Sequence, residues 1–318
     1  MWKNHLKPHN NNQMNENSIH KTEHGIGLMC GAMLLLPLLD CLAKILGQGG
    51  ISSGQIVLFR FVLQVLFLLP VLMITNQLRF NFEYFGLQII RAIAMCLTTF
   101  CFFIAVKHMP LADSISIFFV EPMILTLLSV IFLGEIIRFR RIMAIIIGFI
   151  GALIIIRPQF NSVGIVAFLP LITAFCFAVY MLITRFFSEK IPPIQLQFQM
   201  GLIISPIMLL LILAFPDSGD LYFTNPSWIE LQMLFSLGLV AMIGHLMIVF
   251  ATTKAPANLL APFQYLEIVG ATILGYFIFN DIPSYLTFVG IGLIVTSGIY
   301  LWYRENQGKS STEIKIRT

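Results

Sequence analysis

The chain has 318 residues, of which 58% are hydrophobic and only 11% are charged. Soluble domains carry about 25% charged residues, so this composition excludes a water-soluble globular protein. The formal net charge of +4 at pH 7 is not gathered in a basic stripe, which argues against a nucleic-acid partner.

Ten apolar segments follow one another, each close to the length that crosses a bilayer core of about 30 Å. We expect helices at 25–46, 54–75, 86–106, 111–133, 142–157, 163–186, 195–215, 228–252, 257–279 and 284–303. Their short connections are rich in glycine and proline and leave no room for a soluble domain. The sequence therefore predicts an all-α integral membrane protein with ten transmembrane helices.

The ends of the chain and the basic residues indicate the orientation. Residues 1–24 are polar and lack the apolar core of a secretory signal, so we expect a disordered cytoplasmic tail. With the N-terminus inside, the cytoplasmic segments hold fourteen Lys and Arg residues, and the outer loops hold only Lys107 and Arg157. This bias predicts that both termini, including the tail at 304–318, are cytoplasmic.

An internal repeat becomes visible when the chain is shifted by 146 residues. The shift aligns Pro110 with Pro256, Glu121 with Glu267, and Glu135 with Asp281. Apolar residues align by composition alone, but prolines and acids in register favour a true duplication. Each half has five helices, an odd number, so the second half would enter the membrane from the opposite side. We expect two inverted five-helix repeats, at 25–158 and 159–303.

Short motifs within these helices resemble those of a known family. They are EP…FLGE at 121–135, QYLE…IFND at 264–281, LFRF at 58–61 and GFIG at 148–151. Over residues 25–303 the chain resembles the drug/metabolite transporter superfamily of the EamA type. The resemblance implies a ten-helix inverted-repeat transporter with a central cavity, in a bacterial inner membrane. The second half departs from the pattern, with Asp281 where Glu is usual and without an aligned GxxG.

One further run, APFQYLE at 261–267, is similar to that of S-adenosylmethionine uptake carriers of intracellular bacteria. This likeness implies a small organic metabolite as the substrate.

Six charged side chains lie inside the apolar segments, where a charge costs about 2.5–3.5 kcal/mol and so indicates function. Glu121 and Glu267 are a duplicated pair. They could bind a cationic group or carry a proton, because a buried carboxyl group can exchange a proton near neutral pH. A structural acid paired with a buried arginine is the alternative. The other charged side chains are Asp40, Lys44, Arg60 and Arg91.

Asp40 and Lys44 lie four residues apart on one helix face, in the order that favours an ion pair. They form either a clamp or gate at the cavity mouth, or an internal structural pair. Arg60 lies deeper and could neutralise Glu121 or Glu267, or bind a substrate carboxylate. The balance of three acids against three bases favours internal pairing.

Other polar residues in the spans suggest further roles. Arg91 lies near its helix end and can snorkel to the surface. His245, the only histidine in a span, is either a proton relay or a neutral ring bonded to a neighbouring helix. Gln264 and Tyr265 supply polar edges on an aromatic background, which suits a small amphipathic metabolite.

Two acids and a glycine motif lie near helix ends and helix crossings. Glu135 and Asp281 precede the fifth and tenth helices, where a carboxylate can bind free N–H groups and complement the helix dipole. Gly148 and Gly151 allow close helix packing, either within one protomer or at a homodimer seam.

The motifs expected of other protein classes are missing from the sequence. It has no GxxxxGK[ST] loop, so ATP is not the direct energy source, and it has no HExxH or GxSxG. Its five cysteines are irregularly spaced, so we expect no metal site and no cofactor. The sequence predicts a secondary transporter of a small organic metabolite that works by alternating access, with proton coupling or exchange. A membrane-embedded enzyme and a channel are the alternatives.

Overall fold

The computed structural model describes residues 11–76, 84–133, 139–187, 190–216, 219–255 and 257–316. Within these ranges all regular elements are helical, which confirms the predicted all-α class. The α-helices are α1 (Asn11–Gln48), α2 (Ser53–Ile74), α3 (Phe85–His108), α4 (Leu111–Phe118), α5 (Glu121–Leu133), α6 (Phe139–Val163), α7 (Leu169–Phe187), α8 (Pro193–Ala214), α9 (Trp228–Lys254), α10 (Ala257–Leu260), α11 (Leu266–Phe279) and α12 (Tyr285–Ile316). Two 3-10 segments, η1 (Gly164–Phe168) and η2 (Ala261–Tyr265), complete the described chain.

Nine segments of the described chain are long and apolar enough to cross a membrane. One of them, Ile142–Thr184, has 43 residues, about twice the length that one crossing needs. It is interrupted at Gly164, whose φ of +64° lies in the left-handed region that glycine tolerates. The protein is therefore a multi-pass membrane protein in which α6 and α7 meet at a glycine turn.

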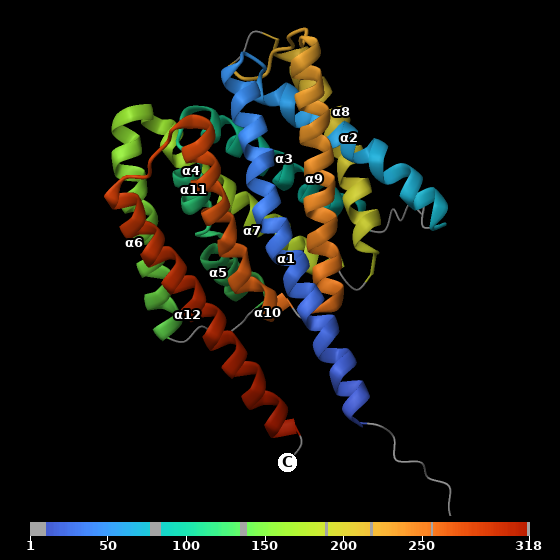
Figure 1. The fold of residues 1–318 in the computed structure, drawn as a ribbon, viewed down its shortest axis with the longest axis vertical. Helices are drawn as coiled ribbons and strands as arrows, with labels where there is room; N and C mark the ends of the chain where they lie inside the picture. Colours follow the sequence, from blue (N-terminus) through green and yellow to red (C-terminus); the bar gives the residue numbers. More distant parts are fainter. Residues whose placement is uncertain are drawn as a thin grey trace, which may run out of the picture.

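The most extensive helix contacts are α1 with α9, α6 with α12, α3 with α7, and α2 with α8. Figure 1 shows α1 and α9 side by side through the middle of the bundle, and α6 and α12 together at one edge. The start of α1 and the end of α12 leave the bundle at the same end, which is the lower end in Figure 1. The opposite end, where α1 passes into α2, is called the Lys44 end below.

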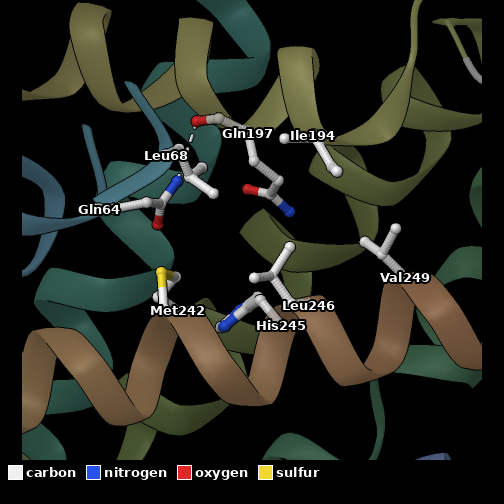
Figure 2. A pocket seen from close by; sticks show the side chains of 8 residues that line it. All are labelled: Gln64, Leu68, Ile194, Gln197, Met242, His245, Leu246 and Val249. Carbon is white, nitrogen blue, oxygen red and sulfur yellow. Dashed lines mark hydrogen bonds between the residues drawn. The ribbon is translucent and has the colours of Figure 1, made fainter. Parts of the chain in front are cut away.

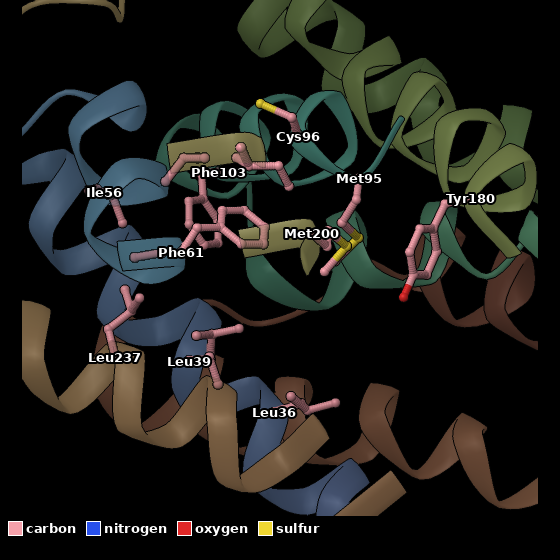
Figure 3. Packing of buried hydrophobic residues seen from close by; sticks show 14 of the residues in the cluster. Leu36, Leu39, Ile56, Phe61, Met95, Cys96, Phe103, Tyr180, Met200 and Leu237 are labelled. Atoms are coloured by element: carbon pink, nitrogen blue, oxygen red, sulfur yellow. The ribbon is translucent and has the colours of Figure 1, made fainter. Parts of the chain in front are cut away.

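The largest core cluster lies where α1, α2, α3, α8 and α9 meet. Phe61 of α2 and Phe103 of α3 both belong to this cluster, and Figure 3 shows Leu39 and Leu237 across from them. Lipid tails are as apolar as these side chains, so the contacts stabilise the bundle mainly through close packing. The core thus holds the helices that surround the site described below.

Glycines bring α6 and α12 into close contact. A Cβ atom on Gly151 would lie 2.9 Å from the carbonyl oxygen of Gly290, so a larger residue would force the helices apart. Gly148 similarly faces Met123 and Ser297. These predicted packing glycines are used within the protomer and do not supply the homodimer seam that was the second interpretation.

Side chains fasten the loop before α9 to the start of α2 at the Lys44 end. The Gln55 Nε2 donates to the Thr224 carbonyl at 2.9 Å, and the Ser52 hydroxyl donates to the Tyr222 carbonyl. The Ser52 oxygen also accepts the Gln55 N–H, and Ser227 caps α9 in a capping box. Such caps satisfy free N–H groups and contribute about 1 kcal/mol each.

The terminal helices are longer than expected. α1 begins at Asn11, so part of the predicted disordered tail at 1–24 is helical, and α12 continues through the tail at 304–318 as far as Ile316. Extending a formed helix adds one hydrogen bond per residue without a new nucleation cost, which explains the difference. Residues 1–10 lie outside the described part.

Candidate functional site

Two of the expected spans are broken in the middle. α4 gives way to α5 at Phe119–Val120, and 146 residues later η2 gives way to α11 between Tyr265 and Leu266. Glu121 and Glu267 therefore each lie in the first turn of a half-helix. The N-terminus of a helix carries partial positive charge, which favours a carboxylate at this position.

Proline accounts for the first break, and a second proline lies just before the second break. Pro122 is the second residue of α5 and has no N–H with which to bond the carbonyl of Phe118, the last residue of α4. Pro262 holds the same second place in η2. Each break frees carbonyl groups, so the interruption supplies polar backbone in the middle of the bundle.

The two breaks lie against each other. The rings of Phe119 and Tyr265, which occupy equivalent repeat positions, have centroids 5.1 Å apart. Tyr265 is also close enough to Glu121 for an electrostatic interaction. Its hydroxyl packs on Gly298 of α12, where a Cβ atom would clash. The predicted site residues Tyr265 and Gln264 thus both belong to the second break, and Gln264 is partly exposed.

A row of aromatic rings continues from this contact. The Phe118 ring lies 5.7 Å from Phe119 and 5.4 Å from Phe177, between centroids. The Phe177 ring in turn lies 5.5 Å from Tyr180. The breaks are therefore flanked by aromatic faces from α4 and α7.

The central acids differ in their surroundings. Glu121 is 9% exposed, and its Oε1 has no hydrogen-bond partner among the described residues. Glu267 is partly exposed and lies close enough to Asp40 of α1 for an electrostatic interaction. Asp40 itself is 4% exposed. Burying a carboxylate without a partner is costly, which makes this cluster unusual for a purely structural core.

Arg60 is the basic residue close to these central acids. It is buried, its Nη1 donates to the Thr99 hydroxyl at 2.8 Å, and it lies in electrostatic reach of Asp40. Among the described residues Arg60 forms no ion pair with Glu121 or Glu267, the two acids that the sequence offered as partners beside a substrate carboxylate. Arg60 instead extends from α2 across to α3 and α1.

The i,i+4 spacing had suggested an ion pair between Lys44 and Asp40, but Lys44 has other partners. Its Nζ donates to Asp281 Oδ2 at 2.6 Å and to the Met109 carbonyl at 3.0 Å. An i,i+4 ion pair on one helix contributes only about 0.2–0.5 kcal/mol. The carboxylate of Asp281 and the carbonyl of Met109, both within hydrogen-bond distance of Nζ, can therefore replace Asp40 as partners of Lys44. Lys44 and Asp40 therefore belong to different clusters.

Asp281 does not cap the helix that follows it, as the sequence had suggested. Asp281 binds Lys44, whereas the Ser284 oxygen caps α12 by accepting the Thr287 N–H at 3.1 Å. A serine at this place satisfies the free N–H and releases Asp281 for an ion pair. Glu135 lies outside the described residues.

Arg91 is buried and does not snorkel. It is 2% exposed, its Nη2 donates to the Leu196 carbonyl at 2.6 Å, and its Nη1 lies 3.4 Å from the Thr184 hydroxyl oxygen. It also lies over the Tyr180 ring, 5.4 Å from the centroid. Because Lys44 and Arg91 are engaged elsewhere, the balance of charges expected from the sequence does not exist at the centre.

A narrow pocket opens between α2, α8 and α9, in the half of the bundle away from the Lys44 end. It is lined by Gln64, Leu68, Ile194, Gln197, Met242, His245, Leu246 and Val249. Figure 2 shows the two carboxamides and the imidazole converging on one gap, with apolar side chains around them. The pocket thus combines an apolar wall with a few polar groups, as small-molecule sites do.

The polar groups of this pocket are mainly acceptors. His245 Nδ1 lies 2.7 Å from the Ala241 carbonyl of its own helix, not of a neighbouring helix as expected. In a neutral ring this bond places the proton on Nδ1 and leaves Nε2 as an acceptor. The Gln64 Nε2 donates to the Gln197 carbonyl at 2.9 Å, and Gln197 Oε1 has no partner in the described chain. His245 is also in electrostatic reach of Arg60, which connects the pocket to the central cluster.

Asp113 is a buried acid that was not among the residues expected from the sequence. It lies in the first turn of α4, is 1% exposed, and accepts a hydrogen bond from Gln159 through Oδ2. Its equivalent in the second half is Leu259, so the repeat gave no signal for it. Among the described residues, no three His, Cys, Asp or Glu side chains come together as a metal site.

Comparison with known proteins agrees with these features. The profile of the EamA-like transporter family matches residues 24–157 and again residues 164–303. A crystal structure at 17% sequence identity superposes with a TM-score of 0.61, covering 88% of this chain and 95% of the other, so the fold is shared.

Several named transporters are similar over most of their length. An S-adenosylmethionine uptake transporter of Rickettsia bellii is 25% identical over 286 residues, 90% of this chain and 96% of the relative. A riboflavin transporter of Brucella anthropi is 27% identical over 263 residues, 83% of this chain and 92% of the relative. A pseudopaline exporter, CntI of Pseudomonas aeruginosa, is 25% identical over 252 residues, 79% of this chain and 86% of the relative.

The relatives and the family are transporters, not enzymes, and the chain has the apolar helices of a membrane protein. The protein is a membrane transporter of small metabolites, and the chain belongs to the EamA-like transporter family.

Proposed function

We propose that this transporter is a secondary carrier that moves a cationic organic metabolite through the centre of the bundle by alternating access. The observation that carries the proposal is the pair of half-helix breaks, with Glu121 and Glu267 each in the first turn after a break. Discontinuous helices near the midplane are where many secondary transporters bind substrate and coupling ions.

We further propose ten crossings in two inverted repeats, at 25–158 and 159–303. In these repeats α1 corresponds to α7, α3 to α9, and α5 to α11. The contact of α1 with α9 then corresponds to that of α7 with α3, and the contact of α1 with α11 to that of α7 with α5. The structure contains all four contacts. The α2–α8 and α6–α12 contacts then join equivalent helices. This pattern is typical of a twofold axis, and five helices per half place that axis in the membrane plane.

The charges at the centre favour a cationic substrate. Asp40, Glu121 and Glu267 lie there with only Arg60 as a base in the described cluster. Carboxylates at membrane depth need a counter-charge or a proton. A substrate cation supplies that charge, and the neighbouring aromatic row supplies faces that attract a cation by about 0.5–2 kcal/mol.

The acceptors in the side pocket favour a substrate that also carries hydrogen-bond donors. Gln197 Oε1 is buried without a partner among the described residues, and a proton on His245 Nδ1 leaves Nε2 as an acceptor. An amino group on the substrate would satisfy them. Among the molecules named for the relatives, S-adenosylmethionine has both a sulfonium cation and amino groups, so we propose a metabolite of this chemistry.

We propose that the protein lies in a bacterial inner membrane with both termini in the cytoplasm, on the basis of the fourteen-to-two distribution of Lys and Arg. The Lys44 end then faces outward, and the side pocket lies in the cytoplasmic half. Energy comes from proton movement through Glu267 or Glu121, or from exchange. All proposed site residues belong to one protomer, so transport does not depend on the homodimer suggested by the sequence.

Untargeted metabolite profiling tests the proposal. Cells expressing the wild type are compared with cells expressing the Glu121→Gln/Glu267→Gln double variant at equal membrane levels. We expect a cationic metabolite to be redistributed between cells and medium only by the wild type. Identical redistribution by both proteins contradicts the role of the two acids. A chemically altered product would favour the membrane-embedded enzyme, and flux that does not saturate would favour a channel.

A further inference from the structure

Lys44 is a buried cation at the end of α1, held by three partners. It is 4% exposed, and its Nζ binds Asp281 Oδ2 at 2.6 Å and the Met109 carbonyl at 3.0 Å. The ammonium also lies 4.5 Å from the centroid of the Phe279 ring. A buried ammonium is stable only while its partners stay in place, so this cluster holds together or separates as a unit.

The Lys44 cluster joins the two halves of the chain. Lys44 and Met109 belong to the first family match, whereas Phe279 and Asp281 belong to the second. Asp281 lies in the connection between α11 and α12, and α11 packs along α1. Any movement that separates the halves at this end must therefore break the Lys44–Asp281 ion pair.

A second ion pair joins the halves nearby. Lys107 Nζ lies 2.7 Å from Asp220 Oδ1, and these side chains are 17% and 16% exposed. Lys107 packs along Gly47, one turn beyond Lys44 on α1. In the Lys44–Asp281 pair the side chains are 5% and 26% exposed, so Lys44 is the most deeply buried of the four charged groups at this end, and Asp281 reaches water.

The opposite end of the bundle has a different arrangement. Lys190, 146 residues after Lys44, holds the equivalent repeat position there. It is exposed, its Nζ lies over the Phe186 and Tyr84 rings at 3.8 and 4.5 Å from their centroids, and within the described chain it has no ion pair. Lys44 is thus fastened across the two halves by described residues, whereas Glu135, the repeat equivalent of Asp281, lies outside the described part of the chain.

We propose that Lys44 and Asp281, with the Met109 carbonyl, form the gate that closes the transport path at this end, and that the structure shows the gate closed. The inference rests on the proposed alternating-access function. Cys41 lies one turn deeper on α1, about 5 Å along the helix axis, and is 1% exposed. This thiol is sealed behind the gate and reports when the gate opens.

The test measures how fast Cys41 reacts with a membrane-impermeant maleimide. The protein is purified in lipid nanodiscs with its other four cysteines replaced. Lys44→Met and Asp281→Asn each remove one charge of the gate, and Asp281→Asn keeps the side-chain shape. We expect each to raise the labelling rate about tenfold or more, because a buried pair that loses one partner no longer favours the closed state.

Three controls make the result specific. Lys190→Met makes the same change at the equivalent position and should leave the rate unchanged. The charge exchange Lys44→Asp/Asp281→Lys should return the rate toward the wild-type value. A second background keeps only Cys96, which is 6% exposed in α3, and its rate should stay low in every variant.

Unchanged Cys41 labelling in both Lys44→Met and Asp281→Asn overturns the gate. Equal acceleration at Cys41 and Cys96 also overturns it, because the ion pair would then stabilise the whole fold. The transport proposal fails separately, through metabolite profiling, whichever result the labelling gives.

Discussion

Glu121 and Glu267 occupy equivalent positions in the two halves of the chain, but their surroundings differ. Glu121 is 9% exposed, has an Oε1 without a partner in the described chain, and lies beside Tyr265. Glu267 is partly exposed and lies near Asp40. Duplication thus repeats the residue and the helix break, whereas the packing around each acid differs between the two halves.

The breaks themselves also differ. Two residues, Phe119 and Val120, connect α4 to α5, whereas the five-residue segment η2 precedes α11. At the start of the second half-helix Glu267 is partly exposed, whereas Glu121 at the start of the first is 9% exposed. We infer that Glu267 is the carboxylate that contacts the substrate, and that Glu121 does not.

The largest expected effect is that of Glu267→Gln. Losing a charge-assisted interaction costs about 1.5–3 kcal/mol, so transport at low substrate concentration should fall between about 10- and 100-fold. The measurement is the initial uptake rate in proteoliposomes, with equal amounts of folded protein confirmed by size-exclusion chromatography. Normal transport by this variant would mean that Glu267 does not face the substrate.

Arg60→Met should come next, because it removes the base of the Asp40 and Glu267 cluster while leaving Glu121 untouched. We expect a loss of about 2 kcal/mol in stability, the cost of leaving a buried charge without its partner. Thermal unfolding followed by circular dichroism measures the loss. Adding Asp40→Asn should recover most of it, and a double variant no more stable than Arg60→Met would separate Arg60 from Asp40.

Gly298→Ala disturbs only the second break. The new methyl group would meet the Tyr265 hydroxyl, and such overpacking costs about 1–3 kcal/mol. We expect reduced stability and slower transport. Gly292→Ala is the matched control on the same helix, since no atom lies within 4 Å of its added Cβ. Equal behaviour of the two variants would show that the position of Tyr265 does not matter.

Glu121→Gln should have the smallest effect, a change in transport rate of no more than about threefold, because less than 1 kcal/mol is at stake for a carboxyl group that substrate does not reach. The same uptake assay measures it. A loss as large as that of Glu267→Gln would show that both acids act in every cycle and would remove the distinction between the two halves.

Sequence alone predicted most of the helices, because membrane thickness sets their length. The expected helix at 228–252, for example, is α9 at Trp228–Lys254. The two breaks were not predicted, because a proline such as Pro122 or Pro262 within a span can also produce only a kink. The ion-pair partner of Lys44 could not be predicted from the sequence, because Lys44 and Asp281 are 237 residues apart and the local spacing indicated Asp40. Arg91 was misplaced for the same reason, because its main partner is a backbone carbonyl on α8.

The most direct test compares wild type, Glu267→Gln and Glu121→Gln in proteoliposomes, with the metabolite that profiling identifies. The account predicts uptake near background for Glu267→Gln and near the wild-type rate for Glu121→Gln. Wild-type uptake by Glu267→Gln, or loss of uptake only in Glu121→Gln, would contradict it.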